Sequence, residues 1–190
     1  MALLYVAVGL VLVVFSAAYY FRKLLHAHLN DRLGKIYNSL MADRKKRLFD
    51  GLNHLKARRD DGRLVILDLG CGPGTNFEFY PPGSEVILVD PNSHCESLVR
   101  RNVRQFPDVR VSQFHVGVAE NLRDLVEADS VDAVVVTLVL CTVADPVRSL
   151  QEIIRVLKPV SDEARQSPLS RLGRVVTLSL IHISEPTRPY

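Results

Sequence analysis

The chain begins with an unbroken apolar segment, and shorter apolar runs follow it at intervals. Residues 2–21 carry no charged side chain and are rich in Leu, Val and Ala. A helix of this length rises roughly 30 Å, which is enough to cross the hydrocarbon core of a bilayer. The pattern therefore predicts a membrane anchor helix over residues 1–23, with Arg22 and Lys23 at its cytosolic end. By the positive-inside rule, the rest of the chain faces the cytosol.

Other interpretations of this segment stay open. Ser16-Ala17-Ala18 has the small residues of a signal-peptide cleavage site, although no basic residue precedes the apolar run. The segment can also insert into one leaflet without crossing the bilayer. A helix buried in a protein core is the least favoured alternative.

A basic stretch with helical periodicity comes next, over residues 24–63. Apolar residues at intervals of three or four predict a helix from 24 to 58. These positions are Leu25, Leu29, Leu33, Ile36, Leu40, Leu48, Leu52 and Leu55. The run Arg44-Lys45-Lys46-Arg47 either contacts anionic lipid headgroups or forms a solvated helix face. Asp60-Asp61-Gly62 predicts a turn that ends this basic helical connector.

Beyond the connector, short continuous apolar runs alternate with helical patterns. This alternation predicts an α/β domain built on a buried parallel sheet. Strands are expected over 64–69, 85–89, 109–116 and 131–137, and helices over 96–105 and 147–158. A further helix is expected to begin within 75–79, directly after a glycine-rich loop.

Composition and charge narrow the possible partners. The chain is 47% hydrophobic and 24% charged, which excludes a disordered chain and a polytopic membrane protein. Residues 22–63 carry a net charge of +7, whereas residues 64–190 carry −4. Because the positive charge lies beside the apolar segment, we expect a membrane partner and no nucleic acid.

The cysteines give little support for disulfides or metal. Cys71, Cys95 and Cys141 are too few and too scattered for a disulfide framework or a metal cluster. A reducing compartment is expected, with no metal site. Cys141 has no interpretable histidine partner, so we expect it to be a buried apolar thiol rather than a nucleophile.

The candidate chemistry starts where the first strand meets the glycine-rich loop Gly70-Cys71-Gly72-Pro73-Gly74. The loop lacks the G-x-G-x-x-G spacing of dinucleotide-binding proteins, since Thr75 stands at the third glycine position, and a nicotinamide-dependent oxidoreductase is disfavoured. With Asp68, the run Asp-x-Gly-x-Gly-x-Gly resembles motif I of the class I S-adenosylmethionine-dependent methyltransferases. The Asp68 carboxylate can pair with the α-amino group of that cofactor, and glycine backbone admits its amino-acid portion.

Further candidates lie near the ends of the later strands. Asp90 can accept hydrogen bonds from both ribose hydroxyls. The stretch around Ala119 and Glu120 resembles the adenine loop of these methyltransferases. The candidate cofactor-binding residues are Asp68, Gly70, Cys71, Gly72, Gly74, Asp90, Pro91, Ala119, Glu120 and Thr137. No side chain stands out as the catalytic base.

A longer run narrows the resemblance. Residues 68–83 include Asn-Phe-Glu-Phe-Tyr-Pro-Pro-Gly and, with Val89-Asp90-Pro91-Asn92 and the stretch 137–143, resemble the methyltransferase-like protein 7 family. These are thiol S-methyltransferases of the endoplasmic reticulum and lipid droplets. The resemblance implies a Rossmann-like class I methyltransferase fold, S-adenosyl-L-methionine as cofactor, and small lipophilic thiols as substrates. It also implies a single-pass or monotopic anchor, with the catalytic body facing the cytosol. The alternative is a non-catalytic membrane-associated fragment that keeps the cofactor-binding half or serves in targeting.

The resemblance ends near Pro159. Residues 178–188 resemble a translated sequencing adapter, so we expect residues 160–190 to be an aberrant, artefactual tail. Its segment 175–183 nevertheless has strand-like composition and can pair beside the fourth strand. Residues 64–159 then form the N-terminal part of a methyltransferase domain, with an incomplete sheet and an exposed apolar edge on the fourth strand. We expect such a chain to have low stability and little methyl-transfer activity.

Overall fold

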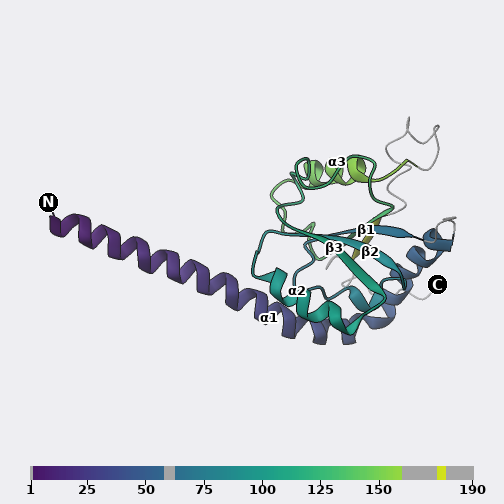
Figure 1. Ribbon diagram of the computed structural model, residues 1–190, viewed down its shortest axis with the longest axis horizontal. Helices are drawn as coiled ribbons and strands as arrows, with labels where there is room; N and C mark the ends of the chain where they lie inside the picture. Colours follow the sequence, from purple (N-terminus) through teal and green to yellow (C-terminus); the bar gives the residue numbers. More distant parts are fainter. Residues whose placement is uncertain (1, 58–62, 160–174, 179–190) are drawn as a thin grey trace, which may run out of the picture.

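A five-stranded parallel sheet lies at the centre of the molecule (Figure 1). The computed structural model describes residues 2–57, 63–159 and 175–178. The strands run in the order β3-β2-β1-β4-β5, and every neighbouring pair is parallel. They are β1 (Leu64–Leu69), β2 (Ser84–Asp90), β3 (Val109–Val116), β4 (Ala133–Thr137) and β5 (Val175–Leu178). The predicted α/β architecture is confirmed.

The central strands form because their sequences are apolar on both faces. Five of the six residues of β1 are buried, and the first four residues of β4 are buried. The predicted strands 64–69 and 109–116 match the observed bounds. The fourth strand starts two residues later than predicted, because Val131 forms only an isolated bridge with Leu157.

Helices cover both faces of the sheet (Figure 1). On one face lies α2 (Cys95–Asn102), which continues into the 3₁₀ helix η2 (Val103–Gln105). On the other lies α3 (Pro146–Val156), whose start is capped because Asp145 Oδ1 accepts a hydrogen bond from Arg148 N at 2.9 Å.

The helix predicted to begin within residues 75–79 is wrong. The chain forms turns there, followed only by the three-residue 3₁₀ helix η1 (Phe77–Phe79). Phe77 and Phe79 are both buried in the core, and Pro81-Pro82 cannot supply helical N–H donors. Packing and proline together end the helix after three residues.

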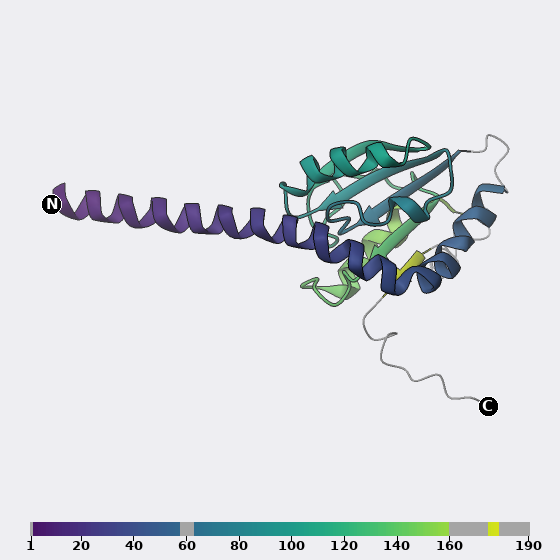
Figure 2. The same cartoon turned by 90° about the horizontal axis from the view of Figure 1, so that it is seen from below.

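The longest element is α1 (Ala2–Ala57), a single helix whose N-terminal half projects from the body (Figures 1 and 2). The predicted helical segments on either side of residue 23 are therefore confirmed as helical, and no break separates them. Large apolar side chains between Leu10 and Phe21 are exposed. Within the described residues, this one helix is long and apolar enough to cross a membrane.

Most of the aliphatic side chains at helical spacing along α1 lie away from the body. Five of its aliphatic side chains are between 49% and 79% exposed: Leu25, Leu29, Leu33, Ile36 and Leu40. The side that packs on the body instead combines Ala27, Met41, Phe49 and Leu52 with buried polar residues. Polar contacts with the body, described below, orient the helix in place of the leucine stripe.

The expected exposed edge of β4 is also corrected. Strand β5 pairs with β4 from Val134↔Val175 to Thr137↔Leu178. The strand predicted over 175–183 is thus confirmed for residues 175–178. The rest of the predicted tail, and the predicted turn at residues 60–62, lie outside the described residues.

Candidate functional site

The glycine-rich loop leaves β1 at the carboxyl end of the sheet. Gly70, Gly72 and Gly74 have φ angles of 63°, 52° and 81°, a region that L side chains rarely adopt. A Cβ atom on Gly70 would lie 2.3 Å from Val139 Cγ2, so glycine allows the segment after β4 to approach. A Cβ atom on Gly72 would meet nothing within 4 Å. The Gly72 backbone therefore faces open space that a ligand can enter.

Asp90 connects the end of β2 to this loop. Its Oδ2 accepts a hydrogen bond from Gly72 N and its Oδ1 accepts one from Asn92 N, both at 2.8 Å. Burial raises the pKa of Asp90, and the two backbone N–H groups oppose that rise. The Cys95 side chain also hydrogen-bonds to this carboxylate, which keeps acceptor capacity for a hydroxyl donor on its remaining lone pair. Pro91 follows Asp90 directly and is exposed.

Asp68 is fully buried beneath the loop. Its Oδ2 accepts hydrogen bonds from Tyr80 OH at 2.6 Å and from Asn76 Nδ2 at 3.1 Å. Burial raises the pKa of Asp68 to about 6, although these hydrogen bonds and the charge of Lys45 act to lower it. With no exposed surface, the carboxylate can meet a ligand ammonium only if Asn76 or Tyr80 moves.

Lys45 brings a positive charge from α1 into the same cluster. Its Nζ donates hydrogen bonds to Asn38 Oδ1 at 2.6 Å and to Asn76 Oδ1 at 2.7 Å. Burial lowers the pKa of Lys45 to about 8, and the charge of Asp68 opposes that change. The expectation that Lys45 contacts headgroups or solvent is therefore wrong, because this side chain is fully buried.

Asn38 and Asn76 extend this polar cluster in two directions. Asn38 Nδ2 donates to the carbonyl oxygen of Thr75, which fastens α1 to the loop. Asn76 Nδ2 lies 3.3 Å from Thr137 Oγ1 at the end of β4. The cluster consequently joins α1, the glycine-rich loop and two strand ends.

The segment after β4 carries local backbone strain. Leu138 has a φ of 59°, which is unusual for a bulky side chain and is often found where function constrains the backbone. The prediction of a buried Cys141 is wrong. Its segment turns outward, with Thr142 N bonded to the carbonyl oxygen of Val139, and leaves the thiol exposed.

The remaining candidates also lie near the carboxyl ends of the strands. Ala119 is buried, and Glu120 Oε1 accepts a hydrogen bond from Ala144 N at 2.7 Å, which links the expected adenine loop to the segment before α3. Cys71 is buried, and burial raises the pKa of its thiol well above the usual range. Most candidate residues are thus grouped around the carboxyl ends of β1, β2 and β4.

Four further residues of this region were not singled out from the sequence: Asn38, Lys45, Asn76 and Tyr80. Asn76 and Tyr80 belong to the specific Asn-Phe-Glu-Phe-Tyr run, which was a usable signal. The sequence carries no signal that distinguishes Lys45, since it is one of four consecutive basic residues.

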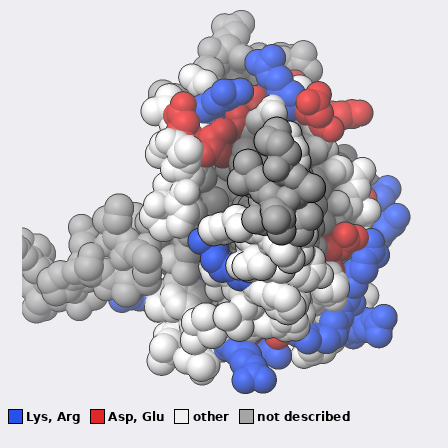
Figure 3. All heavy atoms as spheres, turned by 90° about the vertical axis from the view of Figure 1, so that its left-hand side faces the viewer, with Lys and Arg blue, Asp and Glu red and all other residues white. Residues whose placement is uncertain are grey.

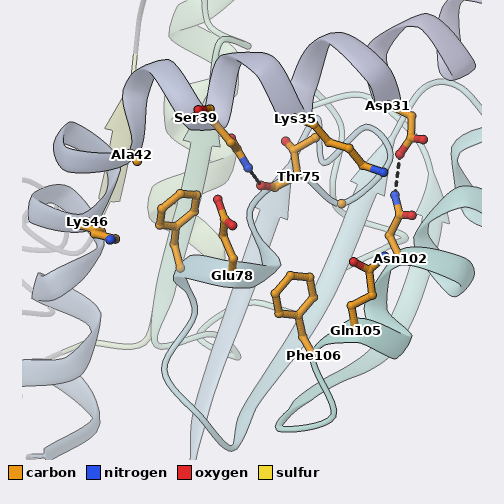
Figure 4. A pocket seen from close by; sticks show the side chains of 13 residues that line it. Asp31, Lys35, Ser39, Ala42, Lys46, Thr75, Glu78, Asn102, Gln105 and Phe106 are labelled. Carbon is orange, nitrogen blue, oxygen red and sulfur yellow. Dashed lines mark hydrogen bonds between the residues drawn. The ribbon is translucent and has the colours of Figure 1, made fainter.

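A separate hollow of about 470 Å³ lies between α1, the loop and the α2–η2 segment (Figure 4). Of the candidate residues, only Gly74 lines it. Asp31 borders this hollow and accepts a hydrogen bond from Asn102 Nδ2 at 2.7 Å. This hollow is therefore distinct from the open space beside Gly72 and Asp90.

The site is chemically suited to a nucleoside ligand. Open parallel sheets bind ligands outside the carboxyl ends of their strands. Here a carboxylate acceptor and an open glycine backbone share that edge. Within the described ranges, no three His, Cys, Asp or Glu side chains gather as a metal site. The parallel sheet and the position of the site at its strand ends place the protein in the class of Rossmann-like α/β folds.

Comparisons with known proteins agree with this class. Residues 67–161, half of the chain, match the family described as "Methyltransferase domain". The chain belongs to this methyltransferase domain family. A crystal structure of a candidate S-adenosyl-L-methionine-dependent methyltransferase from Methanococcus maripaludis has a TM-score of 0.53 at 16% identity. The match covers 78% of this chain and 71% of the Methanococcus maripaludis chain, and it confirms the fold.

Relatives in sequence are thiol S-methyltransferases, which confirms the family resemblance. Thiol S-methyltransferase TMT1A of Homo sapiens is 40% identical over 128 residues, covering 67% of this chain and 51% of the relative. Thiol S-methyltransferase TMT1B of Rattus norvegicus is 41% identical over 119 residues, covering 63% and 48%. The chain thus spans about half the length of these curated relatives.

Proposed function

We propose that the protein binds S-adenosyl-L-methionine at the carboxyl ends of β1 and β2 and transfers its methyl group to small lipophilic thiols. The observation that carries this proposal is the Asp90 carboxylate, bonded to Gly72 N at 2.8 Å beside open space. The family match and the two thiol S-methyltransferase relatives support it.

Each candidate residue has a role that its position permits. Asp90 would accept hydrogen bonds from the ribose hydroxyls, and Pro91 would border that sugar. Ala119 and Glu120 would border the adenine. Asp68 would act by holding Asn76 and Tyr80, which shape the loop.

The loop itself would accommodate the rest of the cofactor. The backbone of Gly70, Cys71, Gly72 and Gly74 would carry its amino-acid portion, with Thr137 nearby at the end of β4. When bound, S-adenosyl-L-methionine supplies an electrophilic methyl group on a sulfonium. The contribution of the chain is chiefly to hold a thiolate in line with that group, because positioning supplies much of the catalysis of such displacements.

We further propose that α1 anchors the protein in the endoplasmic reticulum membrane or at lipid droplets, with the body in the cytosol. Support comes from the exposed apolar surface between Leu10 and Phe21 and from Arg22 and Lys23, which follow it. The family resemblance supports the same location. A nucleic-acid partner is not part of the proposal.

A second candidate function is that of a non-catalytic, membrane-associated protein that binds the cofactor without transferring its methyl group. Incubation of the full chain with methyl-labelled S-adenosylmethionine and a small alkyl thiol separates the two candidates. Labelled thioether supports the enzyme, binding without transfer supports the non-catalytic protein, and absence of binding contradicts both.

A further inference from the structure

The direction in which α1 crosses the body is fixed by contacts near β2. The Tyr20 ring packs edge-on against the His94 ring at a centroid distance of 4.6 Å. Asn92 Nδ2 donates a hydrogen bond to the carbonyl oxygen of Lys23 at 2.9 Å. Asn92 and His94 lie two and four residues after Asp90, where β2 ends. The carboxyl end of β2 therefore lies against the point where the apolar segment of α1 ends.

The other end of α1 meets the opposite part of the sheet. Phe49 and Leu52 share a buried cluster with Leu64, the first residue of β1. Between these ends, Asn38 and Lys45 contact the glycine-rich loop. The central strands thus point toward the N-terminal half of α1 (Figures 1 and 2), and the candidate site lies at that end of the strands.

No linker separates the apolar segment from the body. Because α1 is one helix from Ala2 to Ala57, the body cannot turn freely about residues 21–23. The contacts of Tyr20 and Lys23 hold the body directly at the end of that segment. A membrane that accepts the apolar segment must therefore lie close to the carboxyl edge of the sheet.

Exposed apolar side chains gather at this same edge. Among the described residues outside α1, the exposed large hydrophobic side chains are Val116, Val118 and Val147, at 54%, 46% and 66% exposure. Val116 ends β3, Val118 follows it, and Val147 lies in the first turn of α3, after the segment that follows β4. Seen from the N-terminal end of α1, much of the surface near the helix is uncharged (Figure 3).

We propose that the carboxyl edge of the sheet is the membrane-facing surface of this protein, with Val116, Val118 and Val147 in contact with lipid. The inference rests on the proposed anchoring by α1. It gives the methyl acceptor a direct route, because the candidate site then opens toward the lipid from which a lipophilic thiol would arrive. Apolar side chains at such a surface enter the boundary of headgroups and acyl chains.

A competing geometry would lay α1 flat, with the exposed stripe Leu25–Leu40 on the lipid. The side chains between Leu10 and Phe15 oppose it, because all six are more than half exposed and successive helical positions point in different directions. A helix that is apolar on every side belongs inside hydrocarbon rather than along its surface.

The exposed Cys141 provides a native reporter, because it lies at the carboxyl edge while Cys71 and Cys95 are buried. The full chain is labelled with a thiol-reactive fluorophore and reconstituted in phosphatidylcholine–phosphatidylserine vesicles with or without nitroxide-labelled lipid. Two control variants carry the label elsewhere in a C141S background. A128C places it in the exposed segment before β4, at the opposite edge, and L40C places it on the outer stripe of α1.

Quenching of the Cys141 label should exceed that of both control labels by at least about twofold, since nitroxide quenching requires closeness to the lipid. Equal quenching at Cys141 and A128C, or stronger quenching at L40C, would overturn the proposal. If the chain does not float with the vesicles, α1 does not anchor it in the membrane, and the proposal is overturned. Binding of S-adenosylhomocysteine by the same preparation reports on the cofactor site independently of these outcomes.

Discussion

The buried carboxyl group of Asp68 makes folding stability depend on pH. Its pKa is raised from 3.8 to about 6 in the folded protein, chiefly by burial. The folded state therefore binds this proton more tightly than the unfolded state does. The resulting stabilisation is present below pH 4 and is lost as the pH rises through about 6. A shift of this size corresponds to roughly 3 kcal/mol of unfolding free energy.

The variant D68N isolates this effect, because it cannot titrate. Wild type should lose roughly 2 kcal/mol of stability relative to D68N between pH 4 and pH 6.5, which is most of the full effect. Urea unfolding in detergent micelles measures the difference through the near-ultraviolet circular dichroism of the tyrosines, since the chain has no tryptophan. The variant D108N, at an exposed position, serves as the matched control. A difference between wild type and D68N that does not change with pH would refute the assignment.

Two other variants test the same cluster. In K45M, the fall in unfolding free energy caused by ionisation of Asp68 should extend to higher pH, because the Lys45 charge lowers the pKa of Asp68 in the wild type. If the same urea series shows this fall at an unchanged or lower pH, the reasoning is contradicted. In Y80F, loss of the 2.6 Å hydrogen bond to the buried Asp68 carboxylate should cost about 2 kcal/mol at pH 7, whereas Y19F, at an exposed ring, should cost almost nothing. Equal stability of Y80F and Y19F would show that this hydrogen bond does not form.

The sheet could be predicted closely because its strands are continuous apolar runs. β1 has the predicted bounds, since burial on both faces requires an apolar side chain at nearly every position. β3, at the edge of the sheet, also has the predicted bounds, although only its first residue is buried. The glycine-rich loop and Asp90 were also readable, because positive φ angles and a strand-end carboxylate have recognisable sequence signals. Local pattern and tertiary structure agree at these places.

The position of α1 could not be predicted for a physical reason. Periodic leucines normally mark the buried face of a helix, yet Leu29 and Leu33 are exposed here. The buried side includes Lys45, whose charge is accommodated because Asn38 and Asn76 accept its hydrogen bonds and Asp68 lies nearby. Such long-range polar pairing leaves no periodic trace in the sequence.

The outward turn at Cys141 and the short η1 were missed for a related reason. An apolar run after β4 suggests burial, but the backbone at Leu138 adopts a left-handed conformation and redirects the segment. After the loop, the need to bury Phe77 and Phe79 competes with helix formation. In both cases tertiary contacts override the local preference.

The central claim is that Asp90 and the glycine-rich loop form a site for an adenosyl ligand. Titration calorimetry of the full chain with S-adenosylhomocysteine tests it most directly, with NAD as comparison ligand and D108A as control variant. S-adenosylhomocysteine should bind and NAD should not, and D90A should weaken binding by about tenfold or more, which is at least about 1.4 kcal/mol. Unchanged affinity in D90A, or preference for NAD, would contradict the account.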